Sequence, residues 1–136
     1  MTNRLHAQSG SDTAAEIANA IRPIASLLSK SKKSLQKLIP GTWQHARLLD
    51  RIAALHIAIL LMDAERNNAG NFTHLELREG LSVIAGLIEE CEKVTAKFSR
   101  GTSQHTMLLN RCNALSIAQI LVGAELLKET GSRRNR

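Results

Sequence analysis

Apolar side chains recur along this chain at alternating spacings of four and three residues, in two series that lie sixty residues apart. The first series is Ile17, Ile21, Ile24, Leu28, Ser31, Leu35 and Leu38, and the second is Leu77, Leu81, Ile84, Ile88, Cys91, Thr95 and Phe98. These spacings place side chains along one face of an α-helix, whereas a half-buried strand would alternate. We therefore expect a long amphipathic helix in each half of the chain.

Signals for helix starts flank both series. Thr13-Ala-Ala-Glu16 and Thr73-His-Leu-Glu76 have the spacing of a capping box, in which the Thr and Glu side chains bond the free amides at a helix start. Gly41-Thr42 and Gly101-Thr102 then predict, in each half, a turn that caps a second helix.

The second helices should run to roughly Arg66 and Glu129, and Gly131 should end the latter. Pro23 in the first series predicts a kink or a late start of the first helix, because proline lacks the amide hydrogen that a helix interior uses. Four helices of similar length result.

The two halves also repeat in sequence. "GTWQHARLLDR" at 41–51 returns as "GTSQHTMLLNR" at 101–111, and residues 21–65 aligned with 81–125 share 19 identities in 45 positions. We therefore predict an all-α fold, a four-helix bundle formed by tandem duplication of an αα-hairpin with a repeat of about 60 residues. The single helical domain would span 12–130, with repeats at 13–66 and 73–129, a disordered tail at 1–11 and a basic tail at 131–136.

The helix around Ile52–Met62 is apolar on nearly its whole circumference, interrupted only by His56. Such a helix needs neighbours on several sides, and a bundle would leave one side open. We therefore expect a protein partner, with a homodimer as the first hypothesis and a different protein as the alternative.

Arg51, Ala58 and Glu65 are seven residues apart, so they lie along one line on this helix. If two chains paired antiparallel through it, Arg51 of one chain would face Glu65 of the other, with Ala58 where the helices cross. The alternative is that both charges lie in solvent, where such pairs contribute little. Short turns in both hairpins also predict that the second helices of the two repeats run parallel within one chain. The predicted partner-binding residues are Arg51, Ile57, Ala58, Leu61, Glu65, Arg111, Ala118 and Glu125.

Charge gives a second functional hypothesis. The net charge is +6 and the pI is about 9.9, a balance that suits phosphate-rich partners. No helix-turn-helix is recognisable and aromatic residues are few, so the composition supports phosphate contact without sequence readout. Acidic residues replace some of these lysines in the second repeat, which indicates two solvated faces or a diverged binding surface. The predicted polyanion-binding residues are Lys30, Lys32, Lys33, Lys37, Arg133, Arg134 and Arg136.

Candidate chemistry is sparse. Gln44-His45 and Gln104-His105 open the second helices, but no Cys, His or carboxylate cluster of ligand spacing accompanies them, so we expect capping and packing, no metal and no cofactor. Cys91 and Cys112 occupy seam positions, and we expect buried free thiols because packed helices are usually too far apart for a disulfide; a redox pair is the alternative.

One spacing resembles an enzyme family. Arg51-Ile-Ala-Ala-Leu-His56 has the R-x4-H spacing of HEPN-type ribonucleases, which are small helical bundles that dimerise around that motif. The resemblance implies RNA cleavage at these two residues. The second repeat departs from it, with Ser116 at the histidine position, and Ile52 stands where that family often has a polar residue.

The sequence as a whole favours a non-enzymatic helical protein–protein interaction module, a small adaptor, regulator or inhibitor. A basic nucleic-acid-binding bundle is the alternative, and a HEPN-like ribonuclease ranks third. The N-terminal residues lack the apolar region of a secretory signal, and the longest apolar stretch is too short to span a bilayer. We therefore expect a cytoplasmic protein of bacterial style with no membrane partner.

Overall fold

The computed structural model describes residues 10–63 and 72–134. Within these ranges the chain forms four α-helices and no strand: α2 (Gly10–Leu35), α3 (Trp43–Met62), α4 (His74–Thr95) and α5 (Ser103–Arg134). The prediction of an all-α fold is confirmed.

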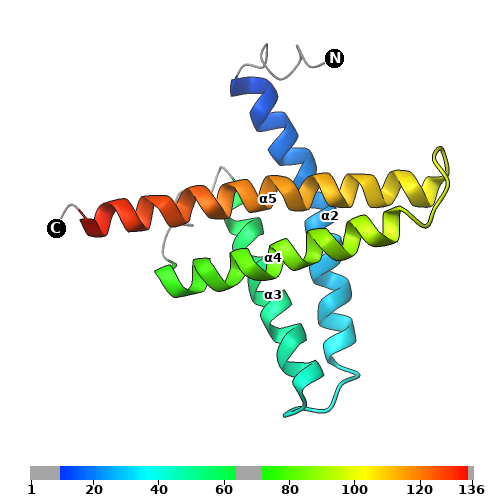
Figure 1. Cartoon of the computed structure of the whole chain (residues 1–136), viewed down its shortest axis with the longest axis horizontal. Helices are drawn as coiled ribbons and strands as arrows, with labels where there is room; N and C mark the ends of the chain where they lie inside the picture. The colour runs from blue at the N-terminus through cyan, green and yellow to red at the C-terminus, as the bar shows by residue number, and fades with distance from the viewer. Residues whose placement is uncertain (1–9, 64–71, 135–136) are drawn as a thin grey trace.

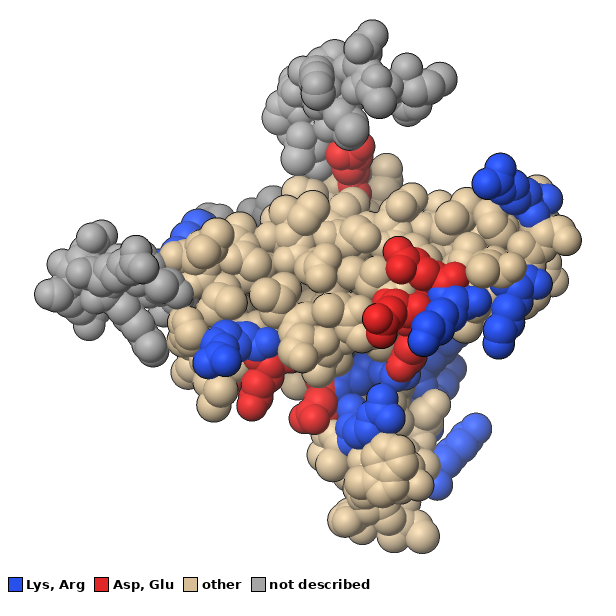
Figure 2. Space-filling model, viewed as in Figure 1, with Lys and Arg blue, Asp and Glu red and all other residues tan. Residues whose placement is uncertain are grey.

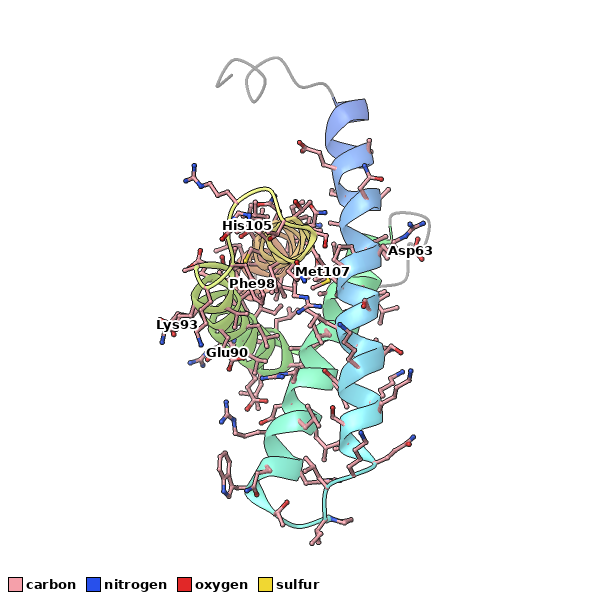
Figure 3. The ribbon with its side chains drawn as sticks, turned by 90° about the vertical axis from the view of Figure 1, so that its right-hand side faces the viewer. Asp63, Glu90, Lys93, Phe98, His105 and Met107 are labelled. Carbon is pink, nitrogen blue, oxygen red and sulfur yellow. The ribbon has the colours of Figure 1, made fainter. Side chains whose placement is uncertain are left out.

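The helices form two antiparallel hairpins that cross each other steeply (Figure 1). Helices α2 and α3 make one hairpin and α4 and α5 the other, and the view turned by 90° shows the second hairpin nearly end-on beside the first (Figure 3). The expectation that α3 and α5 run parallel is therefore wrong. Each of these two helices instead contacts all three other helices, and they contact each other where the hairpins cross.

The two hairpin turns have the same conformation at equivalent residues. Gly41 and Gly101 adopt φ values of 92° and 88°, a left-handed conformation that glycine reaches without steric cost. The Thr42 hydroxyl oxygen accepts the His45 amide at 3.2 Å, and Thr102 accepts the His105 amide at the same distance. Both threonines cap the second helices as predicted.

Helix α4 begins with the predicted capping box. The Glu76 carboxylate accepts the Thr73 amide at 2.9 Å, and the Thr73 hydroxyl oxygen accepts the Glu76 amide at 3.0 Å. The corresponding prediction in the first repeat is wrong, because α2 begins at Gly10 and Thr13 therefore lies inside it. Helix α2 also continues through Pro23, so it does not start late. Burial of its seam at Ala20 and Ile24 favours the helix on both sides of the proline.

The helix ends differ from the sequence expectation. Helix α3 ends at Met62, where the Asp63 amide donates to the Ile59 carbonyl at 3.0 Å, so it stops short of Arg66. Helix α5 continues through Gly131 to Arg134. A glycine costs a helix only about 1 kcal/mol relative to alanine, so it does not end a helix by itself.

The core is aliphatic and lies where the hairpins cross. Its largest fully buried side chains come from all four helices: Ile24, Leu55, Met62, Leu77, Ile84, Leu115 and Val122. Four alanines of α3 and α5 are also buried: Ala54, Ala58, Ala114 and Ala118. Small side chains let neighbouring helices approach closely, as where Ala54 of α3 packs against Gly80 of α4.

Crossing also accounts for the apolar circumference of α3, because α2, α4 and α5 cover it on three sides. Ile57 is 7% exposed, and Ala58 and Ala118 are 0% exposed, so the interpretation of these residues as an outward surface is wrong. Leu61 is partly buried against the same core. The apolar surplus that suggested a second chain is used within one chain.

Residues Ser103–Lys128 of α5 are long and apolar enough to cross a membrane by length and composition alone. Core helices of soluble proteins meet the same test. Leu108, Leu115 and Val122 in this stretch are buried against the other helices. A third of this apolar window is buried, so packing within the chain accounts for only part of the apolar character of α5.

Ile57→Glu should now unfold the protein rather than separate two chains. An unpaired carboxylate in this core should cost about 3–5 kcal/mol of unfolding free energy. Circular dichroism and urea denaturation check this. The matched control is Ile120→Glu, because Ile120 is 68% exposed; it should keep the helicity and stability of the wild type. A folded, stable Ile57→Glu protein would contradict the observed packing.

The two turn threonines offer a test of helix capping. Thr42→Ala and Thr102→Ala should each lower the unfolding free energy by about 1 kcal/mol, because each removes the acceptor of a first-turn amide. The double variant should lose nearly the sum, since the turns belong to different hairpins. Urea denaturation measures all three variants, and losses near zero would show that the hydroxyl contacts are not retained in solution.

Candidate anion-binding surface

The positive charge of the chain is concentrated in the first hairpin. Between Ile17 and Leu49 there are six Lys and Arg residues and no Asp or Glu, whereas the whole chain has 18 and 12. The remainder of the chain is therefore balanced at twelve of each sign. We call residues 17–49 the basic arm; its cations are Arg22, Lys30, Lys32, Lys33, Lys37 and Arg47.

The helix seam orients these cations toward solvent. Ile24, Leu28 and Ser31 of α2 are buried, while all six cations are exposed. At about 100° per residue, Arg22, Lys30 and Lys33 lie within an arc of about 80° on the outer side of α2. On the face drawn in Figure 2, the projecting end of this hairpin is blue and tan, and red appears only where it meets the second hairpin. The structure thus brings the predicted lysine cluster together on one arm.

The tip of the arm adds an aromatic side chain that the sequence analysis did not select. Trp43 is 63% exposed, and the Arg47 guanidinium carbon lies 5.4 Å from the centroid of its ring, a cation–π distance. Ile39 beside it is 72% exposed. Arg22, Trp43 and Arg47 lie outside the lysine run and were not among the predicted residues. The absence of acidic residues between Ile17 and Leu49 was the readable signal.

The second hairpin has no comparable arm. The matching segment, 77–109, carries four cations and four carboxylates, so its charges balance. One of its carboxylates joins the hairpins, since Arg51 Nη2 of α3 lies 3.4 Å from Glu90 Oε1 of α4. Both side chains are partly exposed, and such a pair contributes little to stability. Arg51 therefore has a partner within the chain, where the sequence had suggested Glu65 of a second chain.

The remaining predicted residues are dispersed. Glu125 pairs with Lys128 at 3.6 Å on α5, and Arg111 is half-buried on the same helix. Glu65 and Arg136, and the side chains of Arg133 and Arg134, lie outside the described residues. The structure does not assemble the partner-binding set into one exposed surface.

The R-x4-H pair does not converge on one site. His56 is exposed and lines a groove between α3 and α4 with Asp50 and Glu79, whereas Arg51 lines a different groove with Trp43 and Glu90. Among the described residues, no group of three or more His, Cys, Asp or Glu is placed to hold a metal ion.

The cysteines are closer than helix spacing had suggested. The Cys112 thiol on α5 contacts the Sγ of Cys91 on α4 at 2.7 Å, and both residues are free cysteines. The Thr95 hydroxyl donates to the Cys91 carbonyl at 2.6 Å and lies 3.5 Å from the Cys112 sulfur. Burial, reinforced by Cys112, raises the pKa of Cys91 to about 12. Cys91 is therefore a protonated, unreactive thiol near neutral pH.

Comparison of the sequence with known protein families and curated proteins, and of the fold with solved structures, gives no match.

Cys91 should resist alkylation by iodoacetamide at pH 8 while the protein is folded, because only the thiolate reacts and its raised pKa leaves almost none. Peptide mass spectrometry should find the label on Cys91 only after the chain is unfolded in urea. The unfolded sample is the control for intrinsic reactivity. Rapid labelling of Cys91 in the folded protein would contradict the buried thiol.

Proposed function

We propose that this protein is a non-enzymatic helical module that binds nucleic acid through the basic arm, by phosphate contacts without sequence readout. The observation that carries the proposal is that the arm holds six exposed cations and no carboxylate, a charge equal to the net charge of the whole chain. A solubilising surface would spread its charge, whereas a polyanion-binding surface concentrates cations of one sign.

The shape of the charged surface favours a linear polyanion. Arg22 and Lys33 lie on one side of α2 and are separated by eleven residues, or about 17 Å along the helix at about 1.5 Å per residue. That length corresponds to about five phosphates on one strand of B-form DNA. A membrane surface would meet mainly the tip of the arm and leave Arg22 distant. A nucleic-acid backbone can run along all of it.

The residue types favour backbone contact over base readout. Lysine is a flexible point charge, and four of the six arm cations are lysines. Trp43 supplies one exposed ring on which an unpaired base can stack, a contact that every base can make. We therefore expect tighter binding to single strands than to duplexes of equal length.

Protein–protein interaction, favoured by the sequence, loses its main support because α3 is covered within the chain. The homodimer stays a prediction and would require a surface other than Ile57 and Ala58. Light scattering tests it, with about 30 kDa expected for two chains of 14.9 kDa.

The repeat offers a matched test of the basic arm. Lys33→Gln/Lys37→Gln removes two arm cations, and Lys93→Gln/Lys97→Gln removes the equivalent pair from the second hairpin with the same change of net charge. The first variant should weaken binding to a single-stranded oligonucleotide and lower the slope of log K against log salt by about 1.4 units. The second variant should bind like the wild type. Fluorescence anisotropy over a salt series measures both.

Equal losses in the two variants would show that net charge, and not the arm, determines binding. Absence of wild-type binding at low salt would overturn the nucleic-acid proposal. Preferential binding to vesicles of anionic lipid, or to an acidic polypeptide, would assign the arm to those partners instead.

A further inference from the structure

The two sides of the hairpin crossing are built from equivalent positions. A groove between α3 and α4 includes Asp50, Ala54 and Gly80 in its lining, and a groove between α2 and α5 includes Asn110, Ala114 and Ala20. All ten residues that line the second groove are sixty positions away from residues that line the first. A contact on one side of the molecule therefore predicts where the equivalent residues lie on the other.

This equivalence shows a broken ion pair. On one side, Arg51 of α3 pairs with Glu90 of α4 at 3.4 Å. The equivalent residues on the other side are Arg111 of α5 and Lys30 of α2, so a cation stands where the carboxylate would be. Arg111 therefore lacks the equivalent of Glu90, and an anion beside Arg111 would supply the missing negative charge.

A groove next to Arg111 has the lining that an anion requires. It lies between α2 and the start of α5, and Figure 3 shows Met107 of α5 on the side that faces α2. Two of its side chains are guanidinium groups and four are uncharged hydrogen-bond donors, and no carboxylate is among the lining residues. The lining is Arg22, Pro23, Ser26, Gly101, Ser103, Thr106, Met107, Asn110 and Arg111.

We propose that this groove between α2 and α5 binds a phosphate group. Arg22 and Arg111 approach from different helices and would each offer a guanidinium fork to the phosphate oxygens. Hydroxyls from Ser26, Ser103 and Thr106 can donate to the remaining oxygens, which a tetrahedral anion can use and a planar carboxylate cannot use fully. The site shares Arg22 with the basic arm but does not use Lys33, Lys37 or Trp43, so variants of those residues separate it from the nucleic-acid proposal.

The test is a titration of the full chain with inorganic phosphate at low ionic strength, followed by the amide resonances of Ser103 and Thr106. The wild type should show saturable shifts. Arg111→Gln should weaken binding by at least about tenfold, the effect of losing one charged hydrogen bond. Arg51→Gln is the matched control, because it changes the equivalent residue on the other side of the crossing and should leave the dissociation constant unchanged.

Lys30→Glu gives a second, independent test that should not destabilise the protein. It restores at Arg111 the carboxylate partner that Arg51 already has, so it should abolish phosphate binding. Lys97→Glu makes the same change of charge away from the groove and should not. Unchanged binding in either Arg111→Gln or Lys30→Glu, or shifts of equal size throughout both hairpins, would overturn the site.

An oligonucleotide competition identifies the source of the phosphate. Displacement of inorganic phosphate from the groove by a short single strand would assign the site to a phosphodiester, and retention of both ligands would assign it to a free phosphorylated compound. The Lys33→Gln/Lys37→Gln protein should keep the phosphate-dependent shifts. Failure of the nucleic-acid proposal and failure of the groove are therefore distinguishable.

Discussion

The structure depends on the close crossing of α3 and α5. Neither hairpin can bury its apolar face alone, so each uses the other as the missing half of its core. Alanines at 54, 58, 114 and 118 and leucines at 55 and 115 are all buried in this core, and Ala54 packs against Gly80 of α4. A larger side chain at any of the four alanines would overpack this core and push the neighbouring helices apart.

A steep crossing has a consequence that a parallel bundle lacks, because the ends of both hairpins project beyond the shared core (Figure 1). Side chains on these projecting ends have less apolar surface to cover, so their chemistry can change at little cost to stability. The first end carries only cations, and the second carries both signs in balance. Two arms of similar geometry therefore present different electrostatic surfaces.

The two repeats also differ in charge at the equivalent positions 30 and 90. Glu90 completes an ion pair with Arg51, and Lys30 leaves Arg111 without an equivalent carboxylate. Exposed pairs contribute little to folding, so the loss of one costs little. The electrostatic potential at the groove becomes more positive, because Arg111 and Arg22 line it without an acidic residue.

The helices, their turns and most of the buried seam could be predicted from the sequence, because these depend on local spacing and on capping groups a few residues apart. Thr42, Thr102 and the Thr73–Glu76 capping box were all read correctly for that reason. The lysine cluster was also visible, since it lies on one helix. Two predicted helix boundaries were wrong. Helix α2 begins before Thr13, and helix α5 continues beyond Gly131.

Only the tertiary structure decided how the hairpins meet. Helical periodicity shows that a face is apolar but does not show which neighbour covers it, so α3 could be read as the surface of a dimer or as the centre of one chain. In the folded chain α3 is central. Ile57 and Ala58 are buried, and Arg51 lies beside Glu90 of α4, a helix from the other hairpin. The groove that joins Arg22 to Arg111 likewise unites residues eighty-nine positions apart. Such contacts depend on the angle between hairpins, which local spacing does not encode.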